Sequence, residues 1–366
     1  MEQKVKILLI FLIGIIGWAF YAYIHQIIYG LGVTAMNSPV FWGIYIVNFV
    51  FLSGISVGGI AVASLSLLTG IEKYKSIGQI GGITAIVSLI LAMISILFDL
   101  GRPDRALNLI IYIHPLSPLL WDFIVLNIYL ILCVLLLWSS IKNKQKLLKI
   151  FAYISIPAIF AHSVTAWIFG LIKSQPGWYN ALLAPLFICS ALVSGLSLII
   201  LMILFAKWAL KVDIENDIII DLGKYFKVLL PILLYLLFCE FLTISYGGIP
   251  SHTEILNEML KGKFAIIFWF DMIVGILIPL LLSFSSTGKT IKGICLIAIF
   301  SLFGVFAERI DIVLPSFYRP LLINMPVTYF PTWVEWSLIL GTYALGLLLF
   351  IIASKFVLLK SKEQKK

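Results

Sequence analysis

The sequence predicts an all-α integral membrane protein. Of its 366 residues, 62% are hydrophobic and only 12% are charged, which excludes an ordinary soluble domain. The apolar residues gather in runs of about 20, the length that a helix needs to cross a hydrocarbon core about 30 Å thick. These runs are continuous rather than alternating, so they do not match the strands of a transmembrane barrel.

Ten such runs are present, and we expect each to form a transmembrane helix. They cover approximately residues 5–24, 41–68, 78–98, 119–139, 150–172, 180–206, 225–245, 264–284, 291–307 and 333–357. The loops between them are short, so we expect a single membrane domain over residues 1–366. The first run follows a basic N-terminal segment but lacks a small-residue cleavage site, and we interpret it as a retained helix rather than a signal peptide.

A short internal repeat suggests how the helices are grouped. Ser53-Gly54-Ile55-Ser56 in the second run resembles Ser194-Gly195-Leu196-Ser197 in the sixth, and Trp121-Asp122 in the fourth resembles Trp269-Phe270-Asp271 in the eighth. Both pairs are four runs apart. The pattern predicts two four-helix bundles, helices 2–5 (41–172) and helices 6–9 (180–307), with helices 1 and 10 peripheral. Chance similarity between short apolar segments is the alternative.

The basic residues are distributed unevenly between the two sides of the membrane. Most of the 26 lysines and arginines lie in segments on the side of the N-terminus, and the C-terminus is also lysine-rich. This bias predicts that both termini are cytoplasmic in the inner membrane of a prokaryote. It also accounts for the net charge of +9 without a nucleic-acid partner. All the arginines are on the outer side: Arg102, Arg105, Arg309 and Arg319.

The segment Asp99-Leu100-Gly101-Arg102-Pro103-Asp104-Arg105 places four charges directly after the third apolar run. Charges at the edge of a bilayer are costly unless they are paired or functional. Two interpretations stay open: Asp99 pairs with Arg102 or Arg105 for structural reasons, or the segment forms part of a site.

Further ionisable residues lie within or at the ends of the apolar runs, all in the outer half under this topology. They are Asp122, His162, Glu240, Asp271, Glu308, Arg309, Asp311 and Glu335. Structural ion pairs, such as Glu308, Arg309 and Asp311 with Arg319, are one explanation. A polar cavity is the other, because buried acids commonly mark ligand or proton pathways. The inner half offers hydroxyls but no ionisable residue, so we expect proton exchange to be confined to the outer side.

The residue types narrow the chemistry. Only one of the four histidines, His162, falls inside a run, so the pair of facing histidines that a membrane haem needs is missing. The four cysteines form no C-x-x-C pair, and we expect them to be packing residues. Phosphate-binding and nucleophile-elbow motifs are also absent from the sequence. A lipid-soluble quinone fits better, since its reduction and oxidation need hydrogen-bonding groups and proton exchange.

The Asp99–Arg105 block resembles the D-x-G-R-P-x-R signature of the NrfD/PsrC family, the membrane subunits of polysulfide-reductase-type complexes. Phe41-Trp42-Gly43 and Gly58-Gly59 in the second run are also similar. Three further stretches resemble the ten-helix branch, which includes the membrane subunits of HybB-type hydrogenases, the Dsr sulfur-metabolism complex (DsrP) and alternative complex III. They are Ser117–Asp122, His162–Trp167, and Glu308-Arg309 with Pro331–Glu335.

The resemblance implies a quinone-interacting membrane subunit of a complex for anaerobic respiration, with menaquinone or ubiquinone bound as substrate. It implies no haem or iron–sulfur cluster in this chain, but a ferredoxin-like iron–sulfur subunit and a catalytic subunit docked on the outer side. On this basis the expected site residues are His162, Asp99 and Asp122 at the quinone. Arg102, Asp104, Arg105 and Trp121 are expected at the pocket rim, Glu240 and Asp271 in a proton path, and Glu308, Arg309 and Glu335 in an outer-loop network.

Two other functions stay open. The repeat and the buried acids also fit a secondary transporter, although the charges cluster outward rather than at the midplane. A membrane anchor without its own quinone site is the second alternative.

Overall fold

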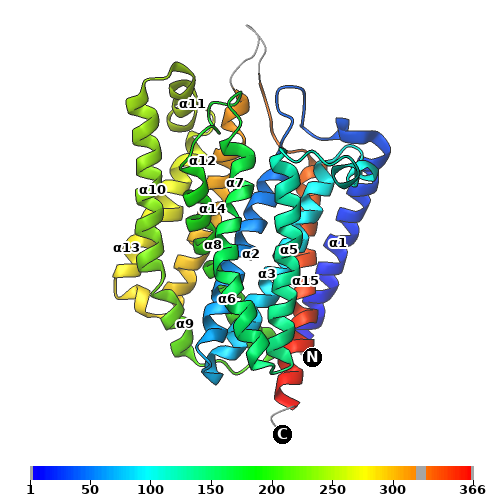
Figure 1. Ribbon diagram of the computed structural model, residues 1–366, viewed down its shortest axis with the longest axis vertical. Helices are drawn as coiled ribbons and strands as arrows, with labels where there is room; N and C mark the ends of the chain where they lie inside the picture. The colour runs from blue at the N-terminus through cyan, green and yellow to red at the C-terminus, as the bar shows by residue number, and fades with distance from the viewer. Residues whose placement is uncertain (1–2, 319–326, 364–366) are drawn as a thin grey trace.

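The computed structural model describes residues 3–318 and 327–363, and every regular element in these residues is a helix. Ten segments of the described chain are long and apolar enough to cross a membrane. The predicted all-helical membrane fold and its ten spans are therefore confirmed. The long helices run side by side in one bundle, and both chain ends lie at the same end of it (Figure 1).

The spans correspond closely to the apolar runs of the sequence, because each run provides one membrane-length helix or a pair of shorter helices in line. They are α1 (Gln3–Tyr29), α2 (Ile44–Leu68), α3 (Glu72–Asp99), α5 (Pro118–Ile141), α6 (Gln145–Ala161) with α7 (Ser163–Gly170), α8 (Leu183–Leu210), α9 (Asn216–Gly223) with α10 (Phe226–Gly247), α12 (Ala265–Trp269) continuing to α13 (Ile278–Phe284), α14 (Ile291–Val313) and α15 (Trp333–Glu363).

Helix α2 is the centre of the molecule. It packs against α3, α8, α6 and α14, and nearly all of its residues are buried. Its closest neighbour contacts are made at glycine: a Cβ added to Gly58 would lie 2.6 Å from Gly195 Cα of α8, and one added to Gly59 would lie 3.0 Å from Ala85 Cβ of α3. Small residues thus let three helix backbones approach closely, which is how helices associate in membranes.

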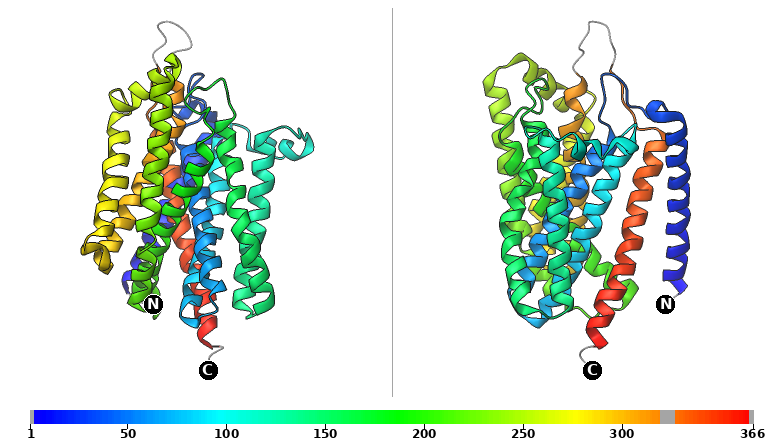
Figure 2. Two further views of the ribbon diagram at one scale, coloured as in Figure 1. Left: turned by 60° about the vertical axis from the view of Figure 1, so that its left-hand side comes forward. Right: turned by 45° about the vertical axis from the view of Figure 1, so that its right-hand side comes forward.

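Several further contacts join spans that follow one another in the chain. In the first half α3 contacts α5 and α5 contacts α6, while in the second half α10 contacts α8 and α13, and α13 contacts α14. Helices α1 and α15 pack on one another at an edge of the molecule (Figure 2). The grouping into two repeated bundles, 41–172 and 180–307, stays a prediction.

Two of the spans are interrupted beside polar residues. Helix α6 contains Pro157, and its boundary with α7 is at His162. The π-helical segment η3 (Phe270–Leu277) separates α12 from α13 and carries Asp271 near its start. A proline removes one backbone hydrogen bond from a helix, and π-helical turns are frequent at functional sites.

The end of the bundle opposite the chain termini carries most of the irregular structure. It includes α11 (Pro250–Leu260) and the short elements η2 (Pro103–Arg105) and α4 (Asn108–Ile111), which cap the helices in Figure 1. These elements form an ordered cap at this end.

Candidate functional site

A buried chain of three polar side chains joins α5 to α7. Asp122 opens the first turns of α5, and His162 and Thr165 flank the start of α7. The Thr165 hydroxyl donates to Asp122 Oδ1 at 2.6 Å and lies 3.3 Å from His162 Nδ1. Asp122 and His162 are each only 3% exposed.

The geometry assigns the tautomer of His162. The single proton of the Thr165 hydroxyl is given to Asp122, so this oxygen can only accept from Nδ1–H of the ring. The other ring nitrogen, Nε2, is then the acceptor, and it is buried without a hydrogen-bond partner among the described residues. The chain therefore ends in a buried ring nitrogen whose lone pair is not engaged by a donor of the described residues.

Phe187 of α8 separates this chain from a second polar cluster. Its ring centroid lies 6.4 Å from that of His162, and the Arg309 guanidinium lies 4.2 Å from the same Phe187 ring. Arg309 is 1% exposed. Its guanidinium donates to the Ser190 hydroxyl of α8 and lies 3.5 Å from a Glu308 oxygen. A buried cation needs such partners, because an unpaired charge in a membrane interior is very costly.

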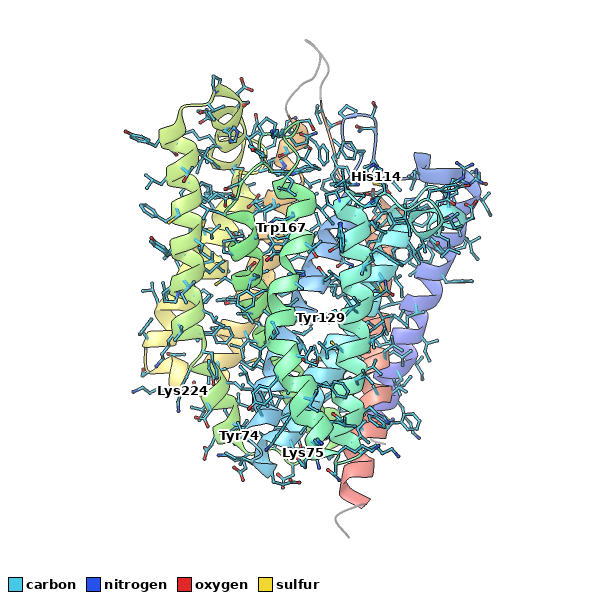
Figure 3. The ribbon with its side chains drawn as sticks, in the orientation of Figure 1. Tyr74, Lys75, His114, Tyr129, Trp167 and Lys224 are labelled. Atoms are coloured by element: carbon cyan, nitrogen blue, oxygen red, sulfur yellow. The ribbon has the colours of Figure 1, made fainter. Side chains whose placement is uncertain are left out.

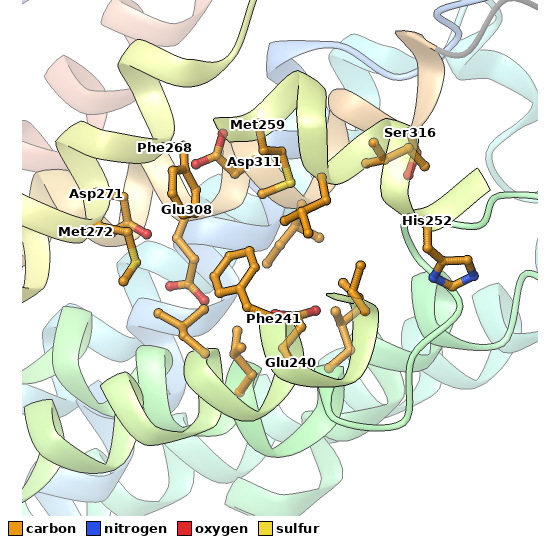
Figure 4. Close-up of a pocket in the computed structure, with 18 residues that line it drawn as sticks. Glu240, Phe241, His252, Met259, Phe268, Asp271, Met272, Glu308, Asp311 and Ser316 are labelled. Atoms are coloured by element: carbon orange, nitrogen blue, oxygen red, sulfur yellow. The ribbon is translucent and has the colours of Figure 1, made fainter. Parts of the chain in front are cut away.

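The second cluster is an acidic pocket between α10, α11, the π-helical segment and α14 (Figure 4). Its cavity volume is about 50 Å³, enough for water molecules. Four carboxyl groups line it: Glu240, Asp271, Glu308 and Asp311. Glu240 accepts a hydrogen bond from Asn180 at 2.9 Å, whereas the Asp311 oxygens are buried without a hydrogen-bond partner in the described residues.

His252 of α11 and Ser316 line the opposite side of this pocket from Asp271 and Met272 (Figure 4). Four acids around one small cavity, beside the Arg309 guanidinium, form a group that can exchange protons when a nearby charge changes. The arrangement suits proton exchange better than catalysis at a large substrate, since the cavity is small.

Asp99 is not part of the hydrogen-bonded chain of Asp122, Thr165 and His162. Its electrostatic neighbours are Tyr45 and Glu335, and one of its oxygens is buried without a hydrogen-bond partner among the described residues. Arg102 pairs with Asp104 instead, at 2.9 Å. The structural interpretation of Asp99 as the partner of Arg102 therefore does not describe the arrangement seen here.

Glu335 belongs to a network that ties the loops together. It accepts from Ala35 N at 2.8 Å, from Thr332 N at 2.9 Å and from the Tyr329 hydroxyl at 2.6 Å. The Tyr329 hydroxyl in turn accepts from Ile44 N at 2.7 Å, and burial raises the pKa of Tyr329. Glu335 thus connects the loop that follows α1 to the start of α15 at the cap.

The expected pocket rim is exposed. Arg102, Asp104 and Arg105 all lie on the surface, and the hydrogen bond from Arg102 lowers the pKa of the Asp104 carboxyl. Trp121 is half exposed, and its indole donates to Pro115 O at 2.7 Å. These groups form a charged surface at the cap rather than the lining of a closed cavity.

Residues 32–320 match the family described as "Polysulphide reductase, NrfD". The chain belongs to the NrfD family. It is 27% identical over 95% of its length to the "Hdr-like menaquinol oxidoreductase integral membrane subunit" of Archaeoglobus fulgidus, of which 92% is covered. It is 26% identical over 92% of its length to a selenate reductase subunit of Mesobacillus selenatarsenatis, of which 90% is covered. The family resemblance of the helix-3 signature is therefore confirmed.

In this NrfD-family chain, the structure brings together two groups of the predicted residues. Asp122 and His162 meet through Thr165, and Glu240, Asp271 and Glu308 meet in the acidic pocket. Arg309 lies between the two groups. Arg319, expected as a partner of Glu308 and Asp311, lies outside the described residues.

Sequence reasoning missed Thr165, Phe187 and Ser190. Thr165 had a usable signal, since it follows His162 by three residues, a spacing that brings side chains to one face of a helix. Phe187 and Ser190 had none, because their importance comes from Arg309, more than a hundred residues away in the chain.

Proposed function

We propose that this protein is the quinone-reactive membrane subunit of a respiratory oxidoreductase complex. Two findings support the proposal. The chain is a member of the NrfD family, and it is similar over nearly its whole length to a menaquinol oxidoreductase membrane subunit.

The observation that carries the proposal is the buried chain Asp122–Thr165–His162. Oxidation of a quinol releases protons together with electrons, so the site needs a base that is shielded from bulk water. His162 Nε2 accepts a proton from the quinol hydroxyl. The ring then gives its Nδ1 proton to Thr165, whose own proton moves to Asp122 Oδ1. One proton is thereby transferred from substrate to carboxylate, and the histidine returns to the neutral form.

Reduction of a quinone uses the same chain in the opposite direction. A group that accepts a proton in one direction of the reaction and donates it in the other works best when its two protonation states are close in free energy. This is the requirement for efficient general acid–base catalysis. In this proposal Asp99, next to Tyr45 and Glu335, is a second proton-accepting group for the quinone.

Electrons leave the membrane through a partner. We assign this role to a ferredoxin-like iron–sulfur subunit that docks on the capped end of the bundle, with a catalytic subunit beyond it. Arg102, Asp104 and Arg105 are exposed at this end and supply charges that can steer and orient a partner protein. The quinone is menaquinone or ubiquinone.

The acidic pocket serves in this proposal to exchange protons with the capped side. Glu240 and Asp271 form its proton path, and His252 at the opposite side connects the pocket to the cap. The capped end is the outer side, and the lysine-rich end with both termini is the cytoplasmic side of a prokaryotic inner membrane.

The test is steady-state turnover with a soluble quinol analogue in the purified complex that contains all its native subunits. His162→Gln is expected to lower kcat by about 100-fold or more, since it removes the base. Thr165→Val is expected to lower kcat by about 10-fold or more, because it interrupts proton transfer between His162 and Asp122. Thr165→Ser keeps the hydroxyl and is expected to restore most of the rate.

A matched control is Thr342→Val. Thr342 is also buried, but its hydroxyl donates only to Leu338 O in its own helix, so kcat should be unaffected. The pH dependence of kcat distinguishes proton transfer from packing: Thr165→Val should flatten it, whereas a packing defect would leave its shape unchanged. Normal kcat in both His162→Gln and Thr165→Val would refute the proposed site.

Solute uptake by the isolated subunit in proteoliposomes would favour a transporter, and quinol turnover that does not require this subunit would favour an anchor.

A further inference from the structure

A large crevice opens at the end of the bundle opposite the acidic pocket. Its volume is about 620 Å³, and it is formed by α2, α8 and the α9–α10 segment, with Tyr74 from the start of α3. Figure 3 shows Tyr74 and Lys224 at this end of the molecule, near the chain termini, and Trp167 of α7 toward the other end. The crevice is thus separate from the proposed quinone chemistry.

The interior of the crevice is apolar. Ala61, Val62 and Leu65 of α2 line one wall, and Leu192 and Leu196 of α8 line another. Gly58 lies at its deep end, where α2 and α8 come closest. The small side chains that allow this close contact also leave the space above it unfilled. The space therefore has the shape and lining to receive a hydrocarbon chain from the membrane.

The charged groups that line the crevice are confined to its membrane-surface end. Lys224 Nζ lies 2.7 Å from Asp221 Oδ1, and the Tyr74 hydroxyl donates to Asp221 Oδ2 at 3.4 Å. Lys73 lies with its Nζ 4.9 Å from the Tyr74 ring centroid and within electrostatic range of Asp221. Lys224 lines the crevice and Lys73 lies beside the lining residue Tyr74, so two lysines face one carboxylate at the entrance.

We propose that this crevice binds one anionic phospholipid from the leaflet on the side of the chain termini. An acyl chain lies along Val62 and Leu196, and the phosphate rests on Lys73 and Lys224, with the Tyr74 hydroxyl nearby. Basic groups between transmembrane helices at a membrane surface are suited to acidic headgroups. Lys224 has a side chain that is 66% exposed despite its ion pair, so it can reach a phosphate without losing Asp221.

The arrangement fits a phospholipid better than a quinone. A quinone would bind with its ring deep in the crevice and its tail extending outward, so it would need hydrogen-bonding groups in the deep part. Here the order is reversed: the deep part is apolar, and the hydrogen-bonding groups are at the surface, as the headgroup and tail of a phospholipid require.

Native mass spectrometry of the complete complex tests the proposal. The complex is stripped of lipid in mild detergent and then incubated with phosphatidylglycerol or with phosphatidylcholine. We expect retention of one additional phosphatidylglycerol and little phosphatidylcholine. The double variant Lys73→Gln/Lys224→Gln is expected to bind phosphatidylglycerol about 10-fold or more weakly, and Val62→Trp, which fills the crevice, should abolish retention.

Two control variants are matched to these changes. Lys142→Gln/Lys146→Gln removes two exposed lysines from the same end of the bundle, and Leu281→Trp adds a tryptophan on the exposed face of α13. Both should retain phosphatidylglycerol like the wild type. Equal binding of the two lipids, undiminished retention in Lys73→Gln/Lys224→Gln, or a co-purifying quinone that Val62→Trp displaces would each overturn the proposal. The lysine variant keeps the test decisive if Val62→Trp does not fold.

Discussion

Glu335 and Asp311 are both buried carboxylates, but they differ in what surrounds them. Glu335 accepts three hydrogen bonds, two from backbone amides and one from Tyr329. The oxygens of Asp311 have no hydrogen-bond partner among the described residues and face a cavity. A fully bonded carboxylate holds structure, whereas an unbonded one beside a cavity is available to water and protons. Buried acidic side chains thus serve two purposes in one molecule.

Tyr329→Phe tests the structural role of the Glu335 network. The change leaves Ile44 N without its acceptor and removes one donor from Glu335. An unsatisfied buried group costs about 1–3 kcal/mol, so the midpoint of thermal unfolding should fall. Tyr246→Phe is the control, because Tyr246 is 92% exposed; it should leave the midpoint unchanged. Equal midpoints for both variants would show that the network does not stabilise the cap.

Among the elements, those set by local composition were predictable and those set by helix pairing were not. The ten spans follow from apolar length. The interruption at His162 was not predicted, nor was the π-helical turn at Asp271, because both depend on what the neighbouring helices supply. Asp99 is outside the hydrogen-bonded chain of His162 for the same reason: hydropathy places residues at a depth, but not around the bundle axis.

Gly58→Ala tests how strongly the fold depends on the contact between α2 and α8. The added Cβ would lie 2.5 Å from Ala191 O, which is backbone and cannot rotate away. Overpacking of this kind costs about 1–3 kcal/mol, so we expect a lower unfolding midpoint in detergent. A Cβ added to Gly17 of α1 would have no neighbouring atom within 4 Å, so Gly17→Ala should leave the unfolding midpoint unchanged. A neutral Gly58→Ala variant would show that the two helices can move apart without loss of stability.

Across the whole molecule, the buried carboxyl groups and the lysine-rich loops lie toward opposite ends of the bundle. The acidic pocket is lined in part by α11 of the cap, whereas Tyr74 and Lys224 of the crevice lie at the end with the termini (Figure 3). Lysine-rich ends of membrane bundles remain in the cytoplasm. In the proposed orientation, quinone chemistry near the cap would release its protons and bind its partner subunits on the outer side.

Labelling of single cysteines in intact cells tests this orientation. One cysteine replaces Ile113, a cap residue that is 61% exposed. The other replaces Lys144, which lies in an exposed loop at the opposite end. A membrane-impermeant maleimide should label Ile113→Cys in intact cells and Lys144→Cys only after permeabilisation, because the positive-inside bias keeps the lysine-rich loops in the cytoplasm. The unmodified chain, whose native cysteines lie within spans, provides the background. The reverse labelling pattern would place the cap in the cytoplasm, and the iron–sulfur partner would then have to dock from that side.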